Sequence, residues 1–433
     1  MVRSLFAASV LLASLVAAPA TAQVPRIISE LSAQQHGLHR SWVSQVEFDP
    51  TSSRVQGMVL DVVDPPDPAG LRRDTLFVHT RSGLIHAMDA ETGGTLWVAQ
   101  VGNRKYPNLG PAVNDQFLAI INGTTLYVLD RTDGHIIWER PMARVPSAAP
   151  TLTPDLLIVP AMSGQISSYR LPVWTDDGWE FPIREENIYQ SFGIINIPPV
   201  ASRESLAWAT SRGFLYISTP DNRTVRFRLQ TRDQVTAPLG YWSPAVMVAS
   251  RDGFVYAINE ISGATMWRYG VGGAIAHPPV CIAGKCYIVP EAGSMYCLQA
   301  PTGEEWWPGP APNVEQLVSA STTKVYATDG YGHLLALDIR TGGMLDSLPI
   351  GGFKRVLTNA QTDRIYLASD SGLVICLRER DLAKPVLHAP PGPLGTPAAQ
   401  PAAGEGAAEE AAAENEAAGN EAEDAEEEES DDF

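Results

Sequence analysis

The stretch LFVHTRSGLIHAMDAETGGTLW, residues 76–97, contains the pattern that decides the fold. An apolar run rich in strand-forming residues leads to Gly83, and a second such run, residues 84–89, leads to Thr92-Gly93 and then to Trp97. Gly supplies the positive φ of a tight hairpin turn, and Asp followed by Thr-Gly favours a second turn. The stretch therefore predicts short strands joined by hairpin turns.

The same pattern recurs along the chain, with hairpin glycines at Gly83, Gly123, Gly164, Gly213, Gly253, Gly293, Gly332 and Gly372. The gaps between them are 40, 41, 49, 40, 40, 39 and 40 residues. A period of about forty residues without helical periodicity excludes helical repeats. The copies around Gly164 and Gly213 depart most from the pattern.

A unit of this length holds four short strands, and one such sheet cannot bury both faces alone. The repeat therefore predicts an all-β fold, an eight-bladed β-propeller with four-stranded antiparallel blades. The tryptophan that ends each well-preserved unit should pack against the neighbouring blade. These tryptophans are Trp42, Trp97, Trp138, Trp267 and Trp307.

The last unit lacks its final strand, because residues 379–384 contain neither Thr-Gly nor Trp. The missing piece is found near the N-terminus, where residues 42–46, WVSQV, resemble residues 97–101, WVAQV. We therefore expect residues 39–48 to form the outer strand of blade eight, which would close the ring and remove its open edges.

The two ends of the chain differ from the repeats. Residues 1–22 have the basic start, apolar stretch and Ala-Thr-Ala end of a signal peptide, so export is predicted. An uncleaved N-terminal anchor is the alternative. No Cys lies near the predicted cut, and no later apolar run is long enough to span a membrane. The propeller is assigned to residues 23–385.

Residues 386–433 are a Pro-rich linker followed by an acidic Ala/Glu tail, in which Glu405 to Asp432 include fourteen Asp and Glu. The formal net charge is −18, so the body without these fourteen carboxylates is close to neutral. The tail is interpreted as a solvating disordered segment, or as a tether for a basic partner or divalent cations. Nucleic-acid binding is not expected of such a chain.

The strand, Gly turn, strand, Thr-Gly and Trp of each unit resemble the pyrroloquinoline-quinone-like β-propeller repeat over residues 40–385. That family includes quinoprotein alcohol dehydrogenases and cofactor-free scaffolds, among them the propeller of the outer-membrane protein assembly machinery. The enzymes usually carry two adjacent Cys beneath the quinone, and this chain has no Cys-Cys pair and no Cys-x-x-Cys-His haem site.

The resemblance therefore implies an exported, periplasmic or extracellular, non-catalytic protein-interaction scaffold in envelope or outer-membrane protein assembly, expected to be a monomer. A dehydrogenase that uses pyrroloquinoline quinone and calcium is an alternative. A propeller that binds a small ligand in its central channel is another. No catalytic, cofactor-binding or metal-ligating residue is nominated.

The four cysteines fall into two groups. Cys281 and Cys286 flank a four-residue hairpin segment, so a cross-strand disulfide is an open alternative to two free thiols in an exported protein. Cys297 and Cys376 occupy a repeat position filled elsewhere by small apolar residues such as Ala87. These two are expected to be buried core residues.

The gap of 49 residues marks the one irregular unit, with about nine residues beyond the repeat. It contains Trp174, Trp179, Phe181 and Tyr189. One interpretation is a degenerate blade edge, and the other is an exposed aromatic loop that docks a protein partner. Both remain open at the level of sequence.

Overall fold

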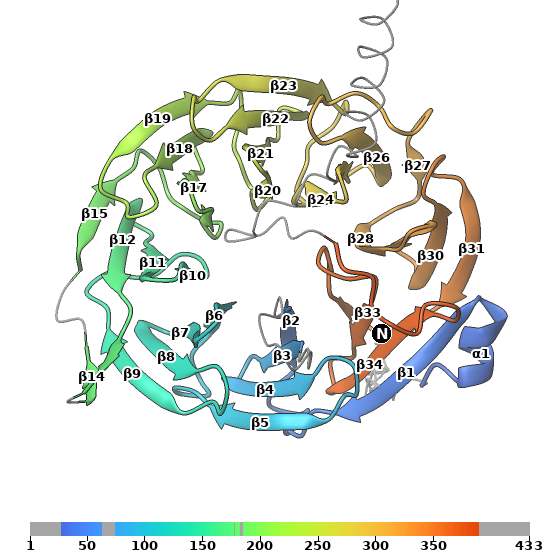
Figure 1. The fold of residues 1–433 in the computed structure, drawn as a ribbon, viewed down its shortest axis with the longest axis horizontal. Helices are drawn as coiled ribbons and strands as arrows, with labels where there is room; N and C mark the ends of the chain where they lie inside the picture. Colours follow the sequence, from blue (N-terminus) through green and yellow to red (C-terminus); the bar gives the residue numbers. More distant parts are fainter. Residues whose placement is uncertain (1–26, 63–73, 177, 182–184, 389–433) are drawn as a thin grey trace, which may run out of the picture.

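The computed structural model describes residues 27–62, 74–176, 178–181 and 185–388. In these residues eight four-stranded antiparallel sheets surround a common axis, which confirms the eight-bladed propeller (Figure 1). A short helix, α1 (Glu30–Gln35), precedes the first strand. The predicted signal peptide and the acidic tail lie outside the described residues. No helix in the described part of the chain is long and apolar enough to cross a membrane.

Each blade runs from an inner strand near the axis to an outer strand at the rim (Figure 1). Blade 1 contains β2 (Val55–Asp61), β3 (Thr75–Thr80), β4 (Leu84–Asp89) and β5 (Thr95–Gln100), and blade 2 contains β6 (Asn108–Val113), β7 (Phe117–Asn122), β8 (Thr125–Asp130) and β9 (Ile136–Pro141). Blade 3 contains β10 (Thr151–Leu152), β11 (Leu156–Pro160), β12 (Gln165–Arg170) and β15 (Asn187–Gln190), and blade 4 contains β16 (Val200–Ala201), β17 (Leu206–Ala209), β18 (Phe214–Ser218) and β19 (Val225–Gln230).

The second half of the ring has the same order of strands. Blade 5 contains β20 (Gly240–Trp242), β21 (Ala245–Ala249), β22 (Phe254–Asn259) and β23 (Thr265–Gly270), and blade 6 contains β24 (Val280–Ile282), β25 (Lys285–Ile288), β26 (Ser294–Gln299) and β27 (Ala311–Pro312). Blade 7 contains β28 (Gln316–Ala320), β29 (Lys324–Thr328), β30 (His333–Asp338) and β31 (Met344–Pro349), and blade 8 contains β32 (Arg355–Val356), β33 (Ile365–Ala368), β34 (Leu373–Glu379) and β1 (Leu38–Gln45). A separate hairpin, β13 (Val173–Thr175) and β14 (Gly178–Glu180), is inserted in blade 3.

Burial follows the position of each strand in its blade. Second strands are almost wholly buried, and β3 and β21 are buried at every residue, because neighbouring blades cover both faces. Outer strands such as β19 alternate between half-buried and exposed residues, because one face meets solvent. All eight hairpin glycines have positive φ, from 61° to 95°. At Gly83 a side chain would also overlap the Val101 carbonyl oxygen, so this position requires glycine.

A tryptophan from one blade packs over a turn glycine of the next blade. The Trp267 ring of blade 5 covers Gly303 of blade 6, where an added Cβ would lie 2.6 Å from the ring. Trp267 Nε1 also donates a hydrogen bond to the Ala300 carbonyl, at 2.9 Å. The same pair of contacts is made by Trp42 with Gly93 and Ala90, by Trp97 with Gly134 and Arg131, and by Trp307 with Gly342 and Ile339. We call this arrangement the Trp–Gly lock.

Other side chains take the Trp position in blades 3, 4 and 7. Asn187 of blade 3 donates to the Asp221 carbonyl of blade 4, at 2.9 Å, and the Phe227 ring of blade 4 covers Gly263 of blade 5. Asp346 of blade 7 accepts a hydrogen bond from His36 Nδ1, at 2.9 Å, from the turn between α1 and β1. Blades 3, 4 and 7 therefore make their contacts from the Trp position with other side chains.

The N-terminal strand closes the ring, as the sequence predicted. β1 pairs with β34 in antiparallel register, with Trp42 opposite Cys376 and Gln45 opposite Leu373. The Val46 amide continues the ladder by donating to the Gly372 carbonyl, at 2.8 Å. Trp42 then locks onto blade 1, so blade 8 is made from both ends of the propeller.

A buried ion pair reinforces this closure. The Arg364 side chain, 1% exposed, contacts the buried carboxylate of Asp363 at 3.3 Å and the carboxylate of Glu91 in blade 1 at 3.1 Å. It also donates to the carbonyls of Leu382 and Ala383, which follow the last strand. Arg364 thus connects blade 8, blade 1 and the C-terminal segment of the propeller.

The described C-terminal segment packs three residues beyond the predicted end of the propeller at residue 385. Leu387 forms an isolated β-bridge with Thr362, and His388 Nε2 donates to the Ala320 carbonyl at 2.8 Å. Residues 386–388, assigned to the linker from sequence, therefore contact blades 7 and 8. The apolar and hydrogen-bonding side chains of these three residues suit such contacts. The Pro-rich composition of the segment gave no sign of them in the sequence.

The cysteines of blade 6 lie together. Cys281 of β24 lies directly opposite Cys286 of β25, and the turn between the two strands consists of Ala283 and Gly284. Both are buried free thiols, and a hydrogen bond between them, together with burial, raises the pKa of Cys286. Cys297 and Cys376 are buried free thiols as well, in line with their expected core positions.

Replacing Gly303 with alanine should destabilise the propeller, because the new methyl group would overlap the Trp267 ring. Gly272 is the matched control, since its φ of 75° is close to the 73° of Gly303 but no atom lies within 4 Å of its added Cβ. We expect Gly303→Ala to lower the unfolding free energy by about 1–3 kcal/mol more than Gly272→Ala. Equal losses in thermal or urea unfolding would show that the lock contributes nothing.

Replacing Arg364 with methionine should cost about 3–5 kcal/mol, because the buried Asp363 carboxylate would lose its cation. The control is Arg251→Met, which removes an exposed ion pair to Glu291 at 3.3 Å and should cost at most about 1 kcal/mol. Urea unfolding of both variants measures the difference. A similar loss for the two would contradict the role of Arg364 in closure.

Cys281 and Cys286 should form a disulfide when the chain is secreted to an oxidising compartment, because antiparallel partners opposite each other lie within disulfide reach. After denaturing alkylation without reductant, mass spectrometry should then find two of the four thiols modified, those of Cys297 and Cys376. Cys286→Ser should expose the Cys281 thiol to the reagent, whereas Cys297→Ser should leave the bridge in place. Alkylation of all four thiols would exclude the bridge.

Candidate functional site

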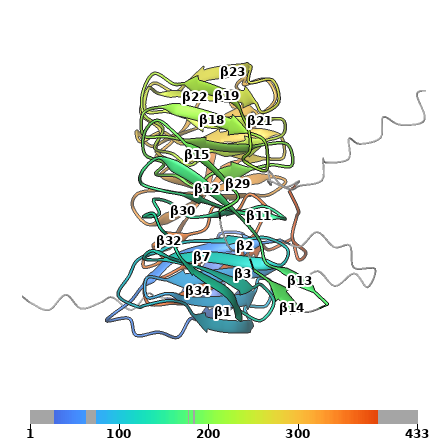
Figure 2. The same ribbon diagram turned by 90° about the vertical axis from the view of Figure 1, so that its left-hand side faces the viewer.

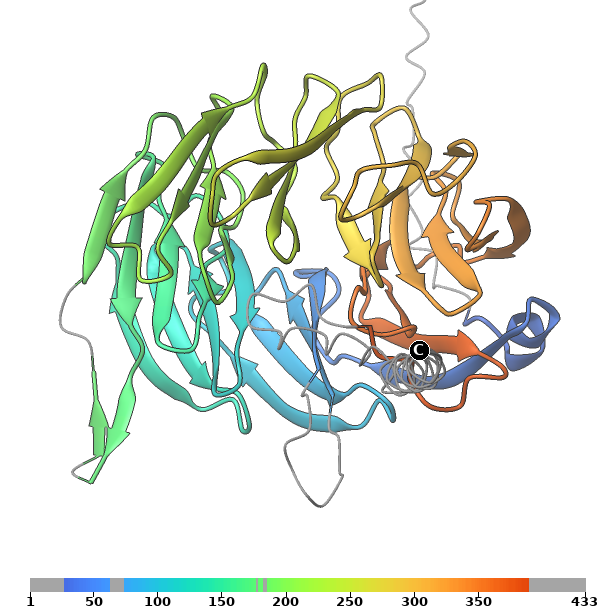
Figure 3. The ribbon, with the colours of Figure 1, turned by 45° about the horizontal axis from the view of Figure 1, so that its top comes forward.

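The propeller has two chemically different faces. Successive strands are antiparallel, so the hairpin glycine turns and the connections between blades lie on one face, which we call the Gly-turn face. The turns after the inner and third strands lie on the opposite face, which includes the β13–β14 hairpin and is called the hairpin face. The hairpin projects from the disc in Figures 2 and 3. Exposed aromatic and apolar side chains gather on both faces at blades 2 to 4.

Two tryptophans in edge-on contact hold the inserted hairpin together. Trp174 of β13 and Trp179 of β14 are directly opposed, with ring centroids 5.3 Å apart in an edge-on arrangement. Trp179 also packs against Phe117 of blade 2, with centroids 6.0 Å apart. Trp174 remains 67% exposed. The insertion therefore exposes Trp174 to solvent, while Trp179 anchors the hairpin to blade 2.

The return of the insertion to blade 3 is anchored by Glu185. Its carboxylate accepts a hydrogen bond from the Tyr169 hydroxyl at 2.7 Å and pairs with Arg144 at 3.0 Å. Burial, and then the nearby Glu185 carboxylate, raise the pKa of Tyr169, so the phenol stays protonated and donates. This contact fixes one base of the hairpin against blades 2 and 3.

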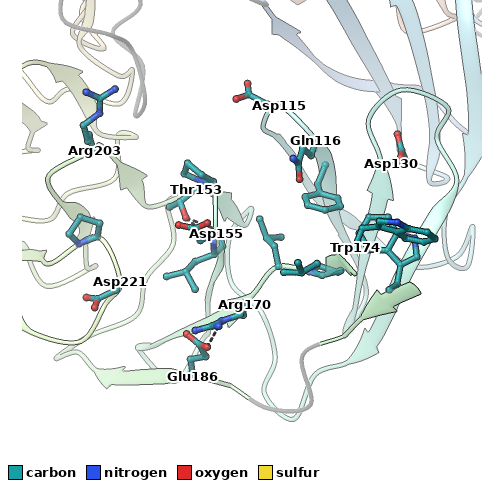
Figure 4. A pocket seen from close by; sticks show the side chains of 18 of the residues that line it. Asp115, Gln116, Asp130, Thr153, Asp155, Arg170, Trp174, Glu186, Arg203 and Asp221 are labelled. Atoms are coloured by element: carbon teal, nitrogen blue, oxygen red, sulfur yellow. Dashed lines mark hydrogen bonds and ion pairs between the residues drawn. The ribbon is translucent and has the colours of Figure 1, made fainter. Parts of the chain in front are cut away.

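A cavity of about 1310 Å³ lies between the hairpin and the turns of blades 2, 3 and 4 (Figure 4). Trp174 and Asp130 lie on one side of it, Asp155 lies near the middle, and Arg203 and Asp221 lie on the other side. Its wall contains five carboxylates, from Asp115, Asp130, Asp155, Glu186 and Asp221, and three guanidinium groups, from Arg170, Arg203 and Arg223.

Most of the positive charge in this cavity is already neutralised. Arg170 pairs with Glu186 at 2.8 Å, and Arg223 pairs with Asp221 at 3.1 Å. Among the residues that the structure describes, the carboxylates of Asp115 and Asp155 have no hydrogen-bond or ion-pair partner, and the same holds for the Arg203 side chain. The unpaired charge is therefore mainly negative.

The Gly-turn face carries an apolar surface at the boundary of blades 3 and 4. Val145, Met162, Phe192 and Ile194 form it, with exposed fractions of 54%, 54%, 55% and 38%. The Met162 amide donates to the Val145 carbonyl at 2.9 Å, and the Ser191 amide donates to the Gly164 carbonyl at 2.8 Å. These bonds connect three segments, namely the one before β10, the Gly164 turn and the one between β15 and β16. We call the surface the rim patch.

Blade 4 supports the rim patch from below. The Phe192 amide donates to the Tyr216 hydroxyl oxygen at 3.0 Å, and Tyr216 stacks on the fully buried Trp208. Trp208 Nε1 donates to the Ser191 hydroxyl at 2.8 Å. The Arg212 guanidinium lies over the Phe192 ring, 4.6 Å from its centroid. The patch is thus an apolar surface on a rigid base, with an arginine beside it.

The structure separates the aromatic residues nominated from sequence. Trp174, Trp179 and the exposed Phe181 belong to the inserted hairpin. Tyr189 lies apart in β15, where its ring contacts Trp208 and Tyr216 beneath the rim patch. The sequence interpretation joined these residues because they are neighbours along the chain, whereas β15 carries the chain from one face to the other.

Sequence reasoning did not single out the rim patch. A signal was present, since Phe192 occupies the position that Gly102 and Gly272 hold in the connections after blades 1 and 5. A large apolar residue in such an exposed connection departs from the repeat. Finding its neighbours Val145 and Met162 required the fold, because they lie 30–47 residues earlier in the chain.

The described residues contain no group of three or more His, Cys, Asp or Glu side chains placed to hold a metal ion. The inner strands, such as β6, lie nearest the axis of the ring (Figure 1). His79 is buried beside β2, and burial lowers its pKa to about 4, so it stays neutral.

Comparisons with known proteins agree on one family. The family model described as "Outer membrane protein assembly factor BamB" matches residues 65–239 and 211–378. The BamB protein of Burkholderia pseudomallei (strain K96243) is 22% identical over 276 residues, which cover 63% of this chain and 62% of that protein.

Two solved structures are similar in fold. BamB from Moraxella catarrhalis has a TM-score of 0.57 at 16% identity, with 78% of this chain and 98% of that chain covered. A computationally designed protein, Ika8, has a TM-score of 0.56 at 14% identity, with 77% and 98% covered. The family model spans most of the propeller and matches the repeat that forms its blades, so the chain belongs to the pyrroloquinoline-quinone-like propeller family of the outer membrane protein assembly factor BamB.

Proposed function

We propose that this protein is an exported, non-catalytic scaffold that docks a protein partner during the assembly of outer-membrane proteins. Membership of the BamB family supports the assembly role, because the family model and the Burkholderia pseudomallei relative are named as outer membrane protein assembly factors. The signal-peptide pattern of residues 1–22 supports export. In this proposal the propeller works on the periplasmic side of the outer membrane.

The rim patch is the observation that carries the docking role. Large apolar side chains that are about half exposed are costly in water unless a partner covers them. An aromatic residue with an arginine beside it, as in Phe192 and Arg212, is typical of the centre of a protein interface. The rigid support from Trp208 and Tyr216 keeps the surface formed without a partner, which lowers the entropic cost of binding.

The proposal assigns no reaction to the chain. A scaffold needs a stable framework that holds its binding surface, and its blades can differ in detail. The eight blades provide such a framework. Partner recognition then depends on the loops of one blade boundary and not on the repeat. The apolar character of the patch indicates an apolar surface on the assembly partner.

The double substitution Phe192→Asp and Ile194→Asp should abolish the assembly function, because two charges would replace the apolar centre of the rim patch. The control is Tyr331→Asp, since Tyr331 is 84% exposed and belongs to the hairpin turn of blade 7, on the same face. In a host that lacks the chain, the wild type and the control should restore outer-membrane β-barrel proteins, measured in the membrane fraction. The double variant should not restore them.

Both variants should keep the wild-type melting temperature and cellular amount, because the replaced side chains are exposed. Full restoration by the double variant would exclude the rim patch as the docking surface. If removal of the chain leaves the outer-membrane β-barrel proteins unchanged, the proposed assembly function itself is wrong.

A further inference from the structure

We infer that the cavity beneath the β13–β14 hairpin binds an extended, cationic segment of a second protein partner, with an arginine or lysine placed against Trp174. This inference goes beyond the proposed function, because the cavity and the rim patch lie on opposite faces of blades 3 and 4. The residues that form the two surfaces therefore lie at opposite ends of the strands.

Charge selects a cationic occupant. Two of the three arginines of the cavity are paired with Glu186 and Asp221, which leaves the carboxylates of Asp115 and Asp155 available to a ligand. Both belong to exposed turns after inner strands, so a partner can reach them. A cationic side chain gains from these carboxylates, whereas an anionic one would meet repulsion from them.

The exposed tryptophan adds a second reason for a cation. A guanidinium or ammonium group over an indole face is attracted by the ring quadrupole, and tryptophan is the best aromatic partner for it. Trp174 is 67% exposed. Its ring packs against Trp179, which in turn packs against Phe117. Asp130 lies on the same side of the cavity (Figure 4). An arginine side chain of the partner at this position could contact the Trp174 ring and the Asp130 carboxylate at the same time.

The size of the cavity favours a peptide segment. At about 1310 Å³ it is larger than the roughly 300–1,000 Å³ of small-molecule sites. Its wall is built from turns of three consecutive blades and from the inserted hairpin, so it forms an elongated path. The acidic residues 405–432 of this chain have the wrong charge to occupy it. The occupant is therefore a basic segment of another protein.

The test uses the full chain and a synthetic, fluorescein-labelled nonapeptide that alternates arginine and valine. Citrulline replaces arginine in the control peptide, which removes the charge and keeps the shape. We expect saturable binding of the arginine peptide by fluorescence anisotropy, and at least roughly tenfold weaker binding of the citrulline peptide. Affinity should fall as salt rises from 50 to 300 mM, about the range over which exposed charges become screened.

Two variants locate the binding. Trp174→Ala, and separately Asp115→Asn with Asp155→Asn, should each weaken binding of the arginine peptide roughly three- to tenfold, with an unchanged melting temperature. The matched control is Phe192→Ser on the Gly-turn face, which should bind the peptide as the wild type does. Because it removes part of the rim patch, the control also separates this inference from the assembly proposal.

Three results would overturn the inference. The first is no saturable binding of the arginine peptide. The second is equal binding of the citrulline peptide, which would show that charge does not matter. The third is wild-type affinity in both cavity variants, which would assign the signal to the acidic tail and not to the cavity.

Discussion

The contact of a tryptophan with a turn glycine of the next blade is the constraint on which the ring depends. A blade buries its faces only against its neighbours, so the position of each blade must be fixed along the axis as well as around it. The indole ring fits where the glycine has no side chain, and its N–H donates to a carbonyl of the same turn, as Trp267 does with Gly303 and Ala300. The contact thus combines apolar burial with one directed hydrogen bond.

The irregular features of the protein begin where this contact is lost. Trp138 has no turn glycine to cover in blade 3, because the inserted hairpin replaces the Thr-Gly turn, and it packs against Tyr169 in an edge-on arrangement instead. Asn187 then takes the Trp position of blade 3 with a smaller side chain. The hairpin, the cavity and the rim patch all lie within one or two blades of this change. Departures from a repeat are the places where function is expected, since the repeat itself already satisfies stability.

The geometry of a blade explains why one irregular unit affects both faces. Each strand crosses the disc from face to face, so an insertion after β12 builds the hairpin face, while the residues that follow β15 emerge on the Gly-turn face. The aromatic cluster of Tyr189, Trp208 and Tyr216 lies between them and supports the rim patch. A propeller with two unlike surfaces, one apolar and one acidic with an exposed tryptophan, follows from a single altered blade.

Period, turn glycines and tryptophans are local signals that repeat, so the sequence predicted the eight blades, the four-strand unit and a closing strand within residues 39–48, where the structure has β1 at Leu38–Gln45. It also located the insertion and Trp174. The grouping of exposed residues from distant parts of the chain became visible only in the fold. Val145 and Met162 are neighbours because two separate segments meet on the Gly-turn face. Tyr189 does not belong to the inserted hairpin, because β15 carries it toward the opposite face. Surfaces depend on contacts between distant segments, and a local pattern contains no information about such contacts.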